Sequence, residues 1–350
     1  MGVNVIKQML RVAASLCLVP LIALHAQSDR PTGTLVASNM SDNTATVIDA
    51  ATGRVLATLP TGDGPHEVAI SRDGKWAVVS NYGVRGKPGN TITVIDVVRH
   101  EVARTITIAD HQRPHGMSFL PGDTLLAVTS EASKAILFVD ARNGNVTRVI
   151  PSNGRATHMI GVSANGDHIV AANIADGTIS LIRPSTADAA TVIRVAAQPE
   201  GIAISPDGST AWAGSNKDSV VLVIDLQKAQ VTDTLRAFGM PYRMAFSPDG
   251  RRAVTTDPVK AQVRIFDAQT HRERSVIQVP RDSVLSTAEV PGSPSPEGVA
   301  ISRDSRWAFV TLQGRNRVAM IDIERGVIVA LAPTGNWSDG VGYSPLVSRP

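Results

Sequence analysis

Three histidines recur at a matching position along the chain, and imidazoles in such a set could hold a metal ion. His66, His115 and His158 lie 49 and 43 residues apart, and each follows a Pro or Thr at the start of a short apolar segment. Imidazole nitrogen is a ligand for Zn, Cu, Fe and Ni, and three imidazoles that leave one coordination position open are typical of a catalytic site. The pattern therefore predicts a single divalent metal ion on His66, His115 and His158.

The same position in later segments carries residues that could complete such a site, namely Glu200, Tyr242, Glu297 and Asp339. A carboxylate near the ion could act as a base on a bound water molecule. Trp337 precedes the last of these segments and is expected to line the same pocket. Together the residues suggest a metal-dependent hydrolase or lyase, or, without a metal, a site that binds a small ligand.

A purely structural role for the histidines is equally compatible with the sequence. Histidine after proline can cap the start of a strand, and duplication of a repeat would copy it. No Walker-type phosphate loop, G-x-S-x-G elbow or C-x-x-C-H haem motif is present. Because no complete catalytic set can be assembled, we expect a scaffold that binds a small ligand or another exported protein. The metal-dependent, lactonase-like enzyme is the alternative.

These positions match because the whole chain is built from one repeat of about 42 residues. An apolar strand that ends in Asp recurs, with its final Asp at Asp49, Asp96, Asp140, Asp225, Asp267 and Asp322, and Arg183 in the one copy that lacks the acid. A second signature, PHEVAIS at residues 65–71, returns in phase at 114–119, 157–163, 199–205, 241–247, 296–302 and 338–344. Seven copies predict seven structural units.

Each unit contains four short apolar segments separated by turn residues, which is typical of a blade of a β-propeller. We therefore predict an all-β, seven-bladed propeller with four antiparallel strands per blade. The N-terminal segments at 35–39, 45–49 and 55–59 supply three strands of one blade, and residues 340–344 supply its fourth. The two ends of the chain thus share a blade and close the ring. Trp76, Trp212 and Trp307 are expected at one second-strand position, packed between blades.

The residues also resemble a known family. The segments SNY at 80–82, NTITVID at 90–96 and GPHEVAISRDGK at 64–75 are similar to the YVTN β-propeller repeat of bacteria and archaea. The resemblance extends from about Gly33 to Ser344 and implies the propeller fold. Members of that family are commonly exported and have diverse functions, so the resemblance implies architecture and little chemistry.

Two irregular segments interrupt the repeat on the side where the histidines are expected. Residues 84–89 form an extra loop after a second strand, and residues 281–295 form a longer insertion that contains Asp282 and Glu289. Long loops on a rigid scaffold often carry recognition, although tolerated surface variation explains them equally well.

Composition and the first residues bear on location and partners. Lys7 and Arg11 precede an apolar run at 12–24, which is typical of a secretory signal at 1–26 and leaves a propeller domain at 27–350. We therefore expect a periplasmic or secreted monomer that is not an integral membrane protein. The net charge is only +3 and no run of Lys or Arg occurs, so nucleic acid is not an expected partner. The single cysteine, Cys17, lies in the signal.

Overall fold

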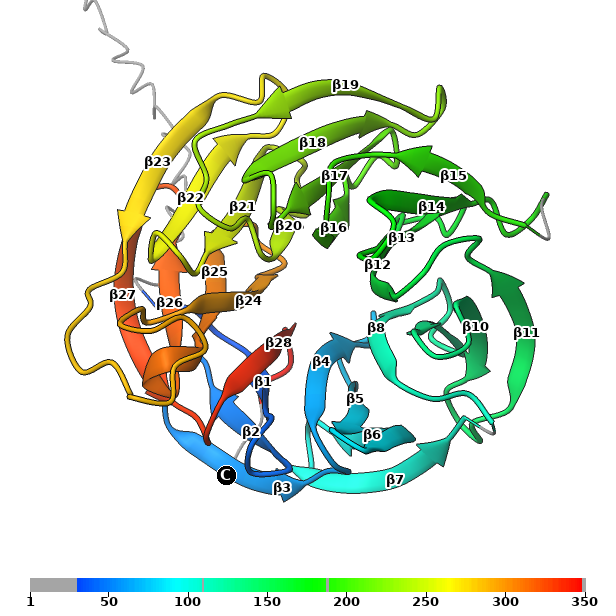
Figure 1. The fold of residues 1–350 in the computed structure, drawn as a ribbon. Helices are drawn as coiled ribbons and strands as arrows, with labels where there is room; N and C mark the ends of the chain where they lie inside the picture. Colours follow the sequence, from blue (N-terminus) through cyan, green and yellow to red (C-terminus); the bar gives the residue numbers. More distant parts are fainter. Residues whose placement is uncertain (1–29, 109, 187–188, 348–350) are drawn as a thin grey trace, which may run out of the picture.

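The computed structural model describes residues 30–108, 110–186 and 189–347 of the chain. These residues form seven four-stranded sheets arranged around a central channel (Figure 1). All neighbouring strands pair in antiparallel fashion. The predicted all-β, seven-bladed propeller is confirmed. The predicted signal at 1–26 lies outside the described residues.

The strands of each blade run from the channel to the outer edge in chain order, except in blade 1, where the C-terminal strand β28 lies innermost. The innermost strands of blades 1 to 7 are β28 (Ser338–Ser344), β4 (Pro65–Ile70), β8 (Pro114–Phe119), β12 (Thr157–Val162), β16 (Pro199–Ile204), β20 (Met244–Phe246) and β24 (Pro296–Ile301). The second strands are β1 (Thr34–Asn39), β5 (Trp76–Val84), β9 (Leu125–Ser130), β13 (Ile169–Asn173), β17 (Thr210–Ser215), β21 (Arg252–Asp257) and β25 (Trp307–Leu312).

The third strands are β2 (Thr44–Asp49), β6 (Lys87–Asp96), β10 (Ala135–Asp140), β14 (Thr178–Ile182), β18 (Val220–Asp225), β22 (Gln262–Asp267) and β26 (Arg317–Asp322). The outermost strands are β3 (Val55–Pro60), β7 (Glu101–Thr107), β11 (Val146–Pro151), β15 (Thr191–Arg194), β19 (Gln230–Leu235), β23 (Glu273–Gln278) and β27 (Val327–Pro333). One short 3₁₀ turn, η1 (Gln313–Arg315), follows β25. No helix in the described part of the chain is long and apolar enough to cross a membrane.

Ring closure follows the predicted scheme. Strand β28 pairs with β1 through Thr34 and Ser344 at one end and Asn39 and Ser338 at the other, so both ends of the propeller lie in blade 1. The hydroxyl of Ser344 also donates a hydrogen bond of 2.7 Å to the carbonyl of Gly74 in blade 2. The last strand is therefore tied to two blades.

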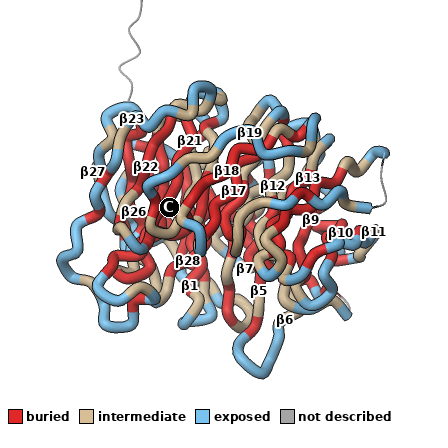
Figure 2. Tube along the Cα trace, turned by 45° about the horizontal axis from the view of Figure 1, so that its top comes forward, coloured by how far each residue is buried: buried red, intermediate tan, exposed pale blue. Residues whose placement is uncertain are grey.

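The apolar core is divided among the seven blade interfaces. One cluster of buried side chains lies between each pair of neighbouring blades, for example Val36, Ala45 and Val47 of blade 1 against Ala77 and Val79 of blade 2. Figure 2 shows buried residues along the inner strands and exposed residues on the turns and outer edges. Because each blade is covered on both faces, its second strand is buried at nearly every position, whether the residue is apolar or polar.

Trp76, Trp212 and Trp307 pack between blades as predicted. Their predicted equivalence was wrong for Trp212. Trp76 and Trp307 pair with Asp96 and Asp322, the final residues of their third strands. Trp212 lies two residues farther along its strand, opposite Val223. The turns before β5 and β17 are equally long, because Ser71 bonds Trp76 and Ser205 bonds Thr210, so Thr210 and not Trp212 is the counterpart of Trp76.

The recurring aspartates have a local role. The Oδ1 of Asp49 accepts hydrogen bonds from the backbone N–H groups of Ala51 at 2.8 Å and Thr52 at 3.1 Å. Asp96 accepts the same pair of bonds from Val98 and Arg99. An Asp side chain that bonds the turn after it stabilises the reversal between third and fourth strands.

Candidate functional site

All eight residues singled out from the sequence line one cavity of about 490 Å³ where the innermost strands begin. Six further residues complete its wall. The members are His66, His115, His158, Glu200, Tyr242, Glu297, Trp337 and Asp339, joined by Met40, Gln198, Asn216, Met240, Glu289 and Gln313. The repeat therefore placed one side chain from every blade at one end of the channel.

A β-bulge in the innermost strand presents the site residues to the cavity. In blade 2, the pairing of β4 with β5 shifts between Pro65 and Val68, so His66 and Glu67 both lie in the bulge. Blades 3, 4, 5 and 7 shift at the same place. A bulge bends a strand and redirects a side chain, and this bend turns the first residues of each strand toward the channel mouth.

Hydroxyl groups of the preceding blade hold the backbone of several site residues. Ser38 donates to the carbonyl of His66, and Thr129 donates to the carbonyl of His158. Thr256 donates to the carbonyl of Glu297 at 2.8 Å, and Thr311 to that of Asp339 at 2.5 Å. These bonds fix neighbouring blades to each other at the level of the cavity, so the site residues project from a rigid ring.

The three histidines are neighbours, as their spacing predicted. The ring centroids of His115 and His158 are 3.5 Å apart, and those of His66 and His115 are 5.1 Å apart. Burial lowers the pKa of His66 to about 4 and that of His115 well below its usual value. Both rings are therefore neutral at neutral pH.

His158 differs from the other two because carboxylates contact both of its ring nitrogens. Nδ1 contacts Glu131, and Nε2 lies 2.9 Å from Oε1 of Glu200. Burial alone would lower the pKa of His158, but the two carboxylates outweigh burial and raise it to about 9. His158 is thus a largely enclosed imidazolium, with 13% of its side chain exposed, that carries a charge at neutral pH.

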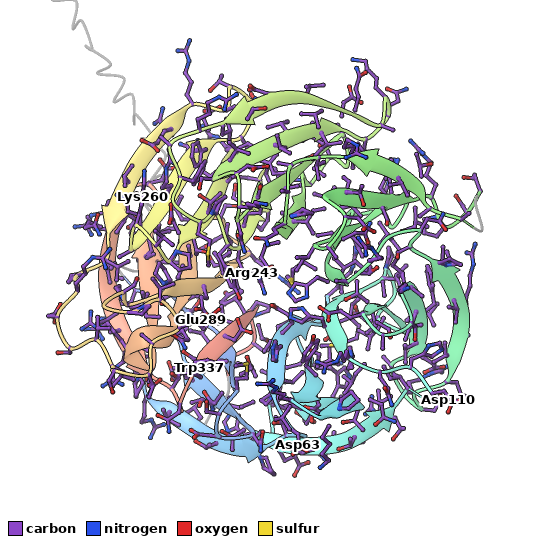
Figure 3. The ribbon with its side chains drawn as sticks, in the orientation of Figure 1. Asp63, Asp110, Arg243, Lys260, Glu289 and Trp337 are labelled. Atoms are coloured by element: carbon purple, nitrogen blue, oxygen red, sulfur yellow. The ribbon has the colours of Figure 1, made fainter. Side chains whose placement is uncertain are left out.

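Arg243 extends this chain of charges across the channel. Its Nη1 donates to Oε1 of Glu200 at 2.7 Å, and its Nη2 donates to Oε1 of Glu67, also at 2.7 Å. Arg243 belongs to blade 6 and Glu67 to blade 2. Blades 7 and 1 lie between these two in the ring, so the ion pair crosses the channel. Figure 3 places Arg243 near the centre of the ring. The sequence Glu131–His158–Glu200–Arg243–Glu67, here called the ion chain, joins five blades.

The opposite side of the cavity contains carboxyl groups without a cationic partner. Glu297 and Asp339 are 3% and 6% exposed, and neither forms an ion pair with Lys, Arg or His within the described residues. Burial raises the pKa of Glu297 well above its usual value, and repulsion from Asp339 adds to this. Burial, with repulsion from Glu67, raises the pKa of Asp339 to about 8.

Of the two irregular segments, the insertion at 281–295 reaches the cavity, whereas Val84 and Arg85 line a neighbouring pocket that shares His66 and Trp337 with it. Residues 84–89 were predicted to be a loop, but they extend β5 and β6 into a longer hairpin in which Val84 pairs with Lys87. This hairpin projects beyond the ring (Figure 2). The insertion at 281–295 contributes Glu289 to the cavity wall, and the carbonyl of its Thr287 accepts a 2.7 Å hydrogen bond from Nε1 of Trp337. Figure 3 shows Glu289 and Trp337 on the same side of the ring.

The three imidazoles, as arranged here, do not fit one metal ion. A ligating imidazole must offer a free nitrogen, and both nitrogens of His158 face carboxylates, whereas the 3.0 Å contact between Nδ1 of His66 and the carbonyl of Gly64 leaves Nε2 of His66 free. Across residues 30–108, 110–186 and 189–347, no group of three His, Cys, Asp or Glu side chains is placed to hold a metal. The metal on His66, His115 and His158 stays a prediction for elemental analysis.

Sequence reasoning missed Glu67, Arg243 and Glu131, whereas Glu289 was named in the insertion but not as a site residue. A signal for the first two was present. The residue after the site position is glycine in four blades, at Gly116, Gly201, Gly298 and Gly340. A Cβ on Gly201 would lie 2.3 Å from the carbonyl oxygen of Tyr242, which shows how closely neighbouring blades approach. Glu67 and Arg243 depart from this glycine with opposite charges, and such a pair can be recognised in the sequence.

Comparison with known proteins identifies the family. A family model described as YNCE-like beta-propeller matches residues 19–124 and 128–274, which is more than half of the chain. The chain belongs to this family. The matched residues of this YNCE-like propeller include the three histidines, Glu200 and Tyr242, whereas Glu297, Trp337 and Asp339 follow the matched region. The resemblance to the YVTN repeat remains a prediction.

A solved structure shares the fold. It is described as the crystal structure of a functionally unknown protein from Desulfotomaculum acetoxidans DSM 771. The two chains superpose with a TM-score of 0.70 at 13% sequence identity, over 89% of this chain and 99% of the other. At this identity the likeness shows the fold alone. No curated protein matched the sequence.

Proposed function

We propose that this YNCE-like propeller is an exported binding protein that holds a small molecule in the cavity at the channel mouth. The observation that carries the proposal is the cavity itself, to which every blade contributes a side chain. Its volume of about 490 Å³ falls within the range of small-molecule sites, roughly 300–1,000 Å³. A concave site of this size favours a small ligand over a macromolecule.

Buried polar atoms around the cavity support a ligand. His115 is 1% exposed and its Nδ1 has no hydrogen-bond partner among the residues described, and the same holds for Nε2 of Gln313, which is 2% exposed. Buried polar atoms in proteins are normally paired, because leaving one unpaired costs about 1–3 kcal/mol. A bound molecule with hydrogen-bonding groups would satisfy these atoms.

The ion chain supports binding more than turnover. Glu200 is held by His158 and Arg243, which outweigh the effect of burial and lower its pKa to about 2. A carboxylate with such a low pKa is a poor base, and His158, already protonated, cannot accept a proton. Glu200 and His158, which looked most suited to acid–base chemistry, are therefore fixed in ion pairs and serve as part of the structure around the cavity.

A thermal-shift screen of metabolites tests the proposal. A ligand at about 100 times its Kd adds about 2.7 kcal/mol of stability to the folded state. Met40→Trp narrows the cavity, and Val149→Trp places the same residue on the exposed face of β11 as the matched control. Hits should stabilise the wild type and Val149→Trp but not Met40→Trp. Equal stabilisation of Met40→Trp, or no hit at all, contradicts the proposal.

Elemental analysis separates binding from the metal-dependent alternative. Protein purified without a His tag or chelator is expected to carry no stoichiometric transition metal. About one equivalent of Zn, Cu, Fe or Ni, lost from a triple His66/His115/His158→Ala variant, would replace the binding proposal with a metal-dependent hydrolase or lyase.

A further inference from the structure

The acidic wall of the cavity, defined as Glu289, Glu297 and Asp339, indicates the chemistry of the ligand. Glu297 and Asp339 are buried, and Oδ1 of Asp339 has no hydrogen-bond partner in the described structure. No Lys, Arg or His forms an ion pair with any of the three within the described ranges, although ion pairs occur throughout the rest of the molecule. Burying carboxyl groups together without a cation is costly.

The cations nearest to the acidic wall are already engaged. Arg243 contacts Glu67 and Glu200, and its Cζ lies 4.3 Å from the ring centroid of Tyr242. His158 is held between Glu131 and Glu200. Neither charge can move to the acidic wall without leaving a buried carboxylate of the ion chain unpaired. A positive charge that would stabilise these carboxyl groups in their ionised form must therefore come from outside the chain.

The remaining wall suits the carbon chain of a ligand. Trp337, Met40 and Met240 line the cavity beside the carboxyl groups. Trp337 has a backbone φ of +56°, which is rare for a bulky residue, and its indole N–H is fixed by the carbonyl of Thr287. Aromatic and thioether groups pack against alkyl chains, and an aromatic face attracts an ammonium group. The strained backbone thus holds a large side chain at the cavity rim.

We propose that the ligand is a small organic cation whose primary ammonium group binds Asp339 and Glu297, with its carbon chain against Trp337 and Met240. This inference rests on the proposed binding function. Ammonium N–H groups would satisfy the unpaired Oδ1 of Asp339 and offset the repulsion within the acidic wall. Nε2 of Gln313 and Nδ1 of His115 are then left to bind polar groups of the ligand.

Proton release is the expected signature of cation binding. The charged and titratable groups that surround Asp339 are Glu67, Glu200, Arg243, Glu289, Glu297 and Tyr242. Repulsion among these carboxyls and burial keep Asp339 protonated at neutral pH. A bound ammonium favours the carboxylate, so binding should expel about one proton at pH 7 and become tighter as the pH rises toward 8.

Isothermal titration calorimetry with hexylamine, 1-hexanol and hexanoate tests the inference, because the three probes share a carbon chain and differ in charge. We expect hexylamine to bind at least tenfold more tightly than 1-hexanol at pH 8.5, and hexanoate not to bind. At pH 7 the enthalpy should depend on the buffer in the sense of proton release. Asp339→Asn and Glu297→Gln should each weaken hexylamine at least tenfold, while Asp282→Asn, an exposed change in the insertion, should have no effect.

The outcomes separate this inference from the binding function. If hexanoate or 1-hexanol binds as well as hexylamine, or if metabolite hits lack an ammonium group, the inference of a cationic ligand is wrong. The proposed binding function then still stands. Hexylamine binding that is unchanged in Asp339→Asn and releases no proton from the wild type also overturns the inference. If no compound of any charge binds, both proposals fall. Proton release from the wild type keeps the test independent of how the variants fold.

Discussion

The two sides of the channel mouth come from the same strand position of the same repeat, yet their charges are arranged in opposite ways. On the side of blades 4 and 5, His158 and Glu200 form part of the ion chain, in which each charge has a partner. On the side of blades 7 and 1, Glu297 and Asp339 are equally buried and have none among the described residues. The repeat therefore determines where a side chain lies, and its neighbours determine which protonation state it holds.

The comparison suggests a division of labour. The ion chain crosses the channel and links five blades. The acidic wall contributes no such link and is costly to the fold. Buried groups that cost stability and are retained are commonly found at functional sites. Variants that remove a charged group from the ion chain or from the acidic wall, but not from both, test this division.

The largest effect is expected from Arg243→Met. The change leaves Glu67 and Glu200 buried without their cation, and breaking a buried pair in this way typically costs about 3–5 kcal/mol. Urea unfolding measures the loss. Arg272→Met, at an exposed turn position, is the matched control and should stay within about 0.5 kcal/mol of the wild type. A loss below about 1 kcal/mol for Arg243→Met would show that the ion chain does not hold the ring together.

His158→Gln should remove about 1–3 kcal/mol, because Glu131 and Glu200 lose a charged partner. The folded-state pKa of His158 is raised to about 9 from 6.5, so its stabilisation is full below about pH 6.5 and is lost as the pH rises through 9. Between pH 7 and 10 the unfolding free energy of the wild type should therefore fall more steeply than that of the variant.

His66→Gln is the internal control for this pH dependence. The folded-state pKa of His66 is lowered to about 4, so His66 reduces stability as the pH falls from about 6.5 to 4 and has no effect above 7. Wild type and His66→Gln should have parallel unfolding profiles between pH 7 and 10. Parallel profiles for His158→Gln as well would mean that His158 is not charged in the folded protein.

Asp339→Asn should change stability in the opposite direction. The folded-state pKa of Asp339 is raised to about 8 from 3.8, so its carboxyl makes folding progressively less favourable as the pH rises from about 4 to 8. The variant should match the wild type near pH 4 and be more stable by about 1 kcal/mol or more at pH 8.5, measured by thermal unfolding. A variant that is less stable at pH 8.5 would place a cationic partner beside Asp339.

The smallest effect is expected from Trp337→Phe. The variant keeps an aromatic ring but loses the hydrogen bond to Thr287, which is worth about 0.5–1.5 kcal/mol. Hexylamine affinity should fall about two- to fivefold, in line with about 0.5–1 kcal/mol for an ammonium on an aromatic face. Calorimetry measures the change, and an unaltered affinity would remove Trp337 from the ligand contacts.

The sequence predicted the fold and the one cavity residue that each blade contributes at the repeat position, because both follow from periodicity. Position in a repeat maps directly onto position in the ring, so His66 and Asp339 could be placed at one mouth although they are far apart in sequence. Trp212 was misplaced because the tryptophans were matched by residue type, whereas the equal turns before β5 and β17 make Thr210 the counterpart of Trp76. The backbone pairing, and not the residue type, sets the register of a strand.

The opposite charges at Glu67 and Arg243 are visible in the sequence, but which carboxylate each cation contacts could not be predicted, because it depends on distances across the channel. Glu67 and Arg243 belong to blades separated by two others, and they meet only because the arginine side chain is long enough to span the channel. Glu131 contacts His158 from a loop of the previous blade. Rotamers and channel radius decide such contacts, and neither is encoded in the spacing of the repeat.

The shared blade 1 also sets the order in which the cavity can be completed. A chain emerges from the ribosome from its N-terminus at roughly 5–20 residues per second. Strand β1 is made early, yet its inner partner β28 follows about 300 residues later. Until then blade 1 has an open inner edge, and Trp337 and Asp339 are missing from the cavity. A nascent chain can thus display all three histidines in place and still have no acidic wall, so the ability to bind a cation would arise only when the ring closes.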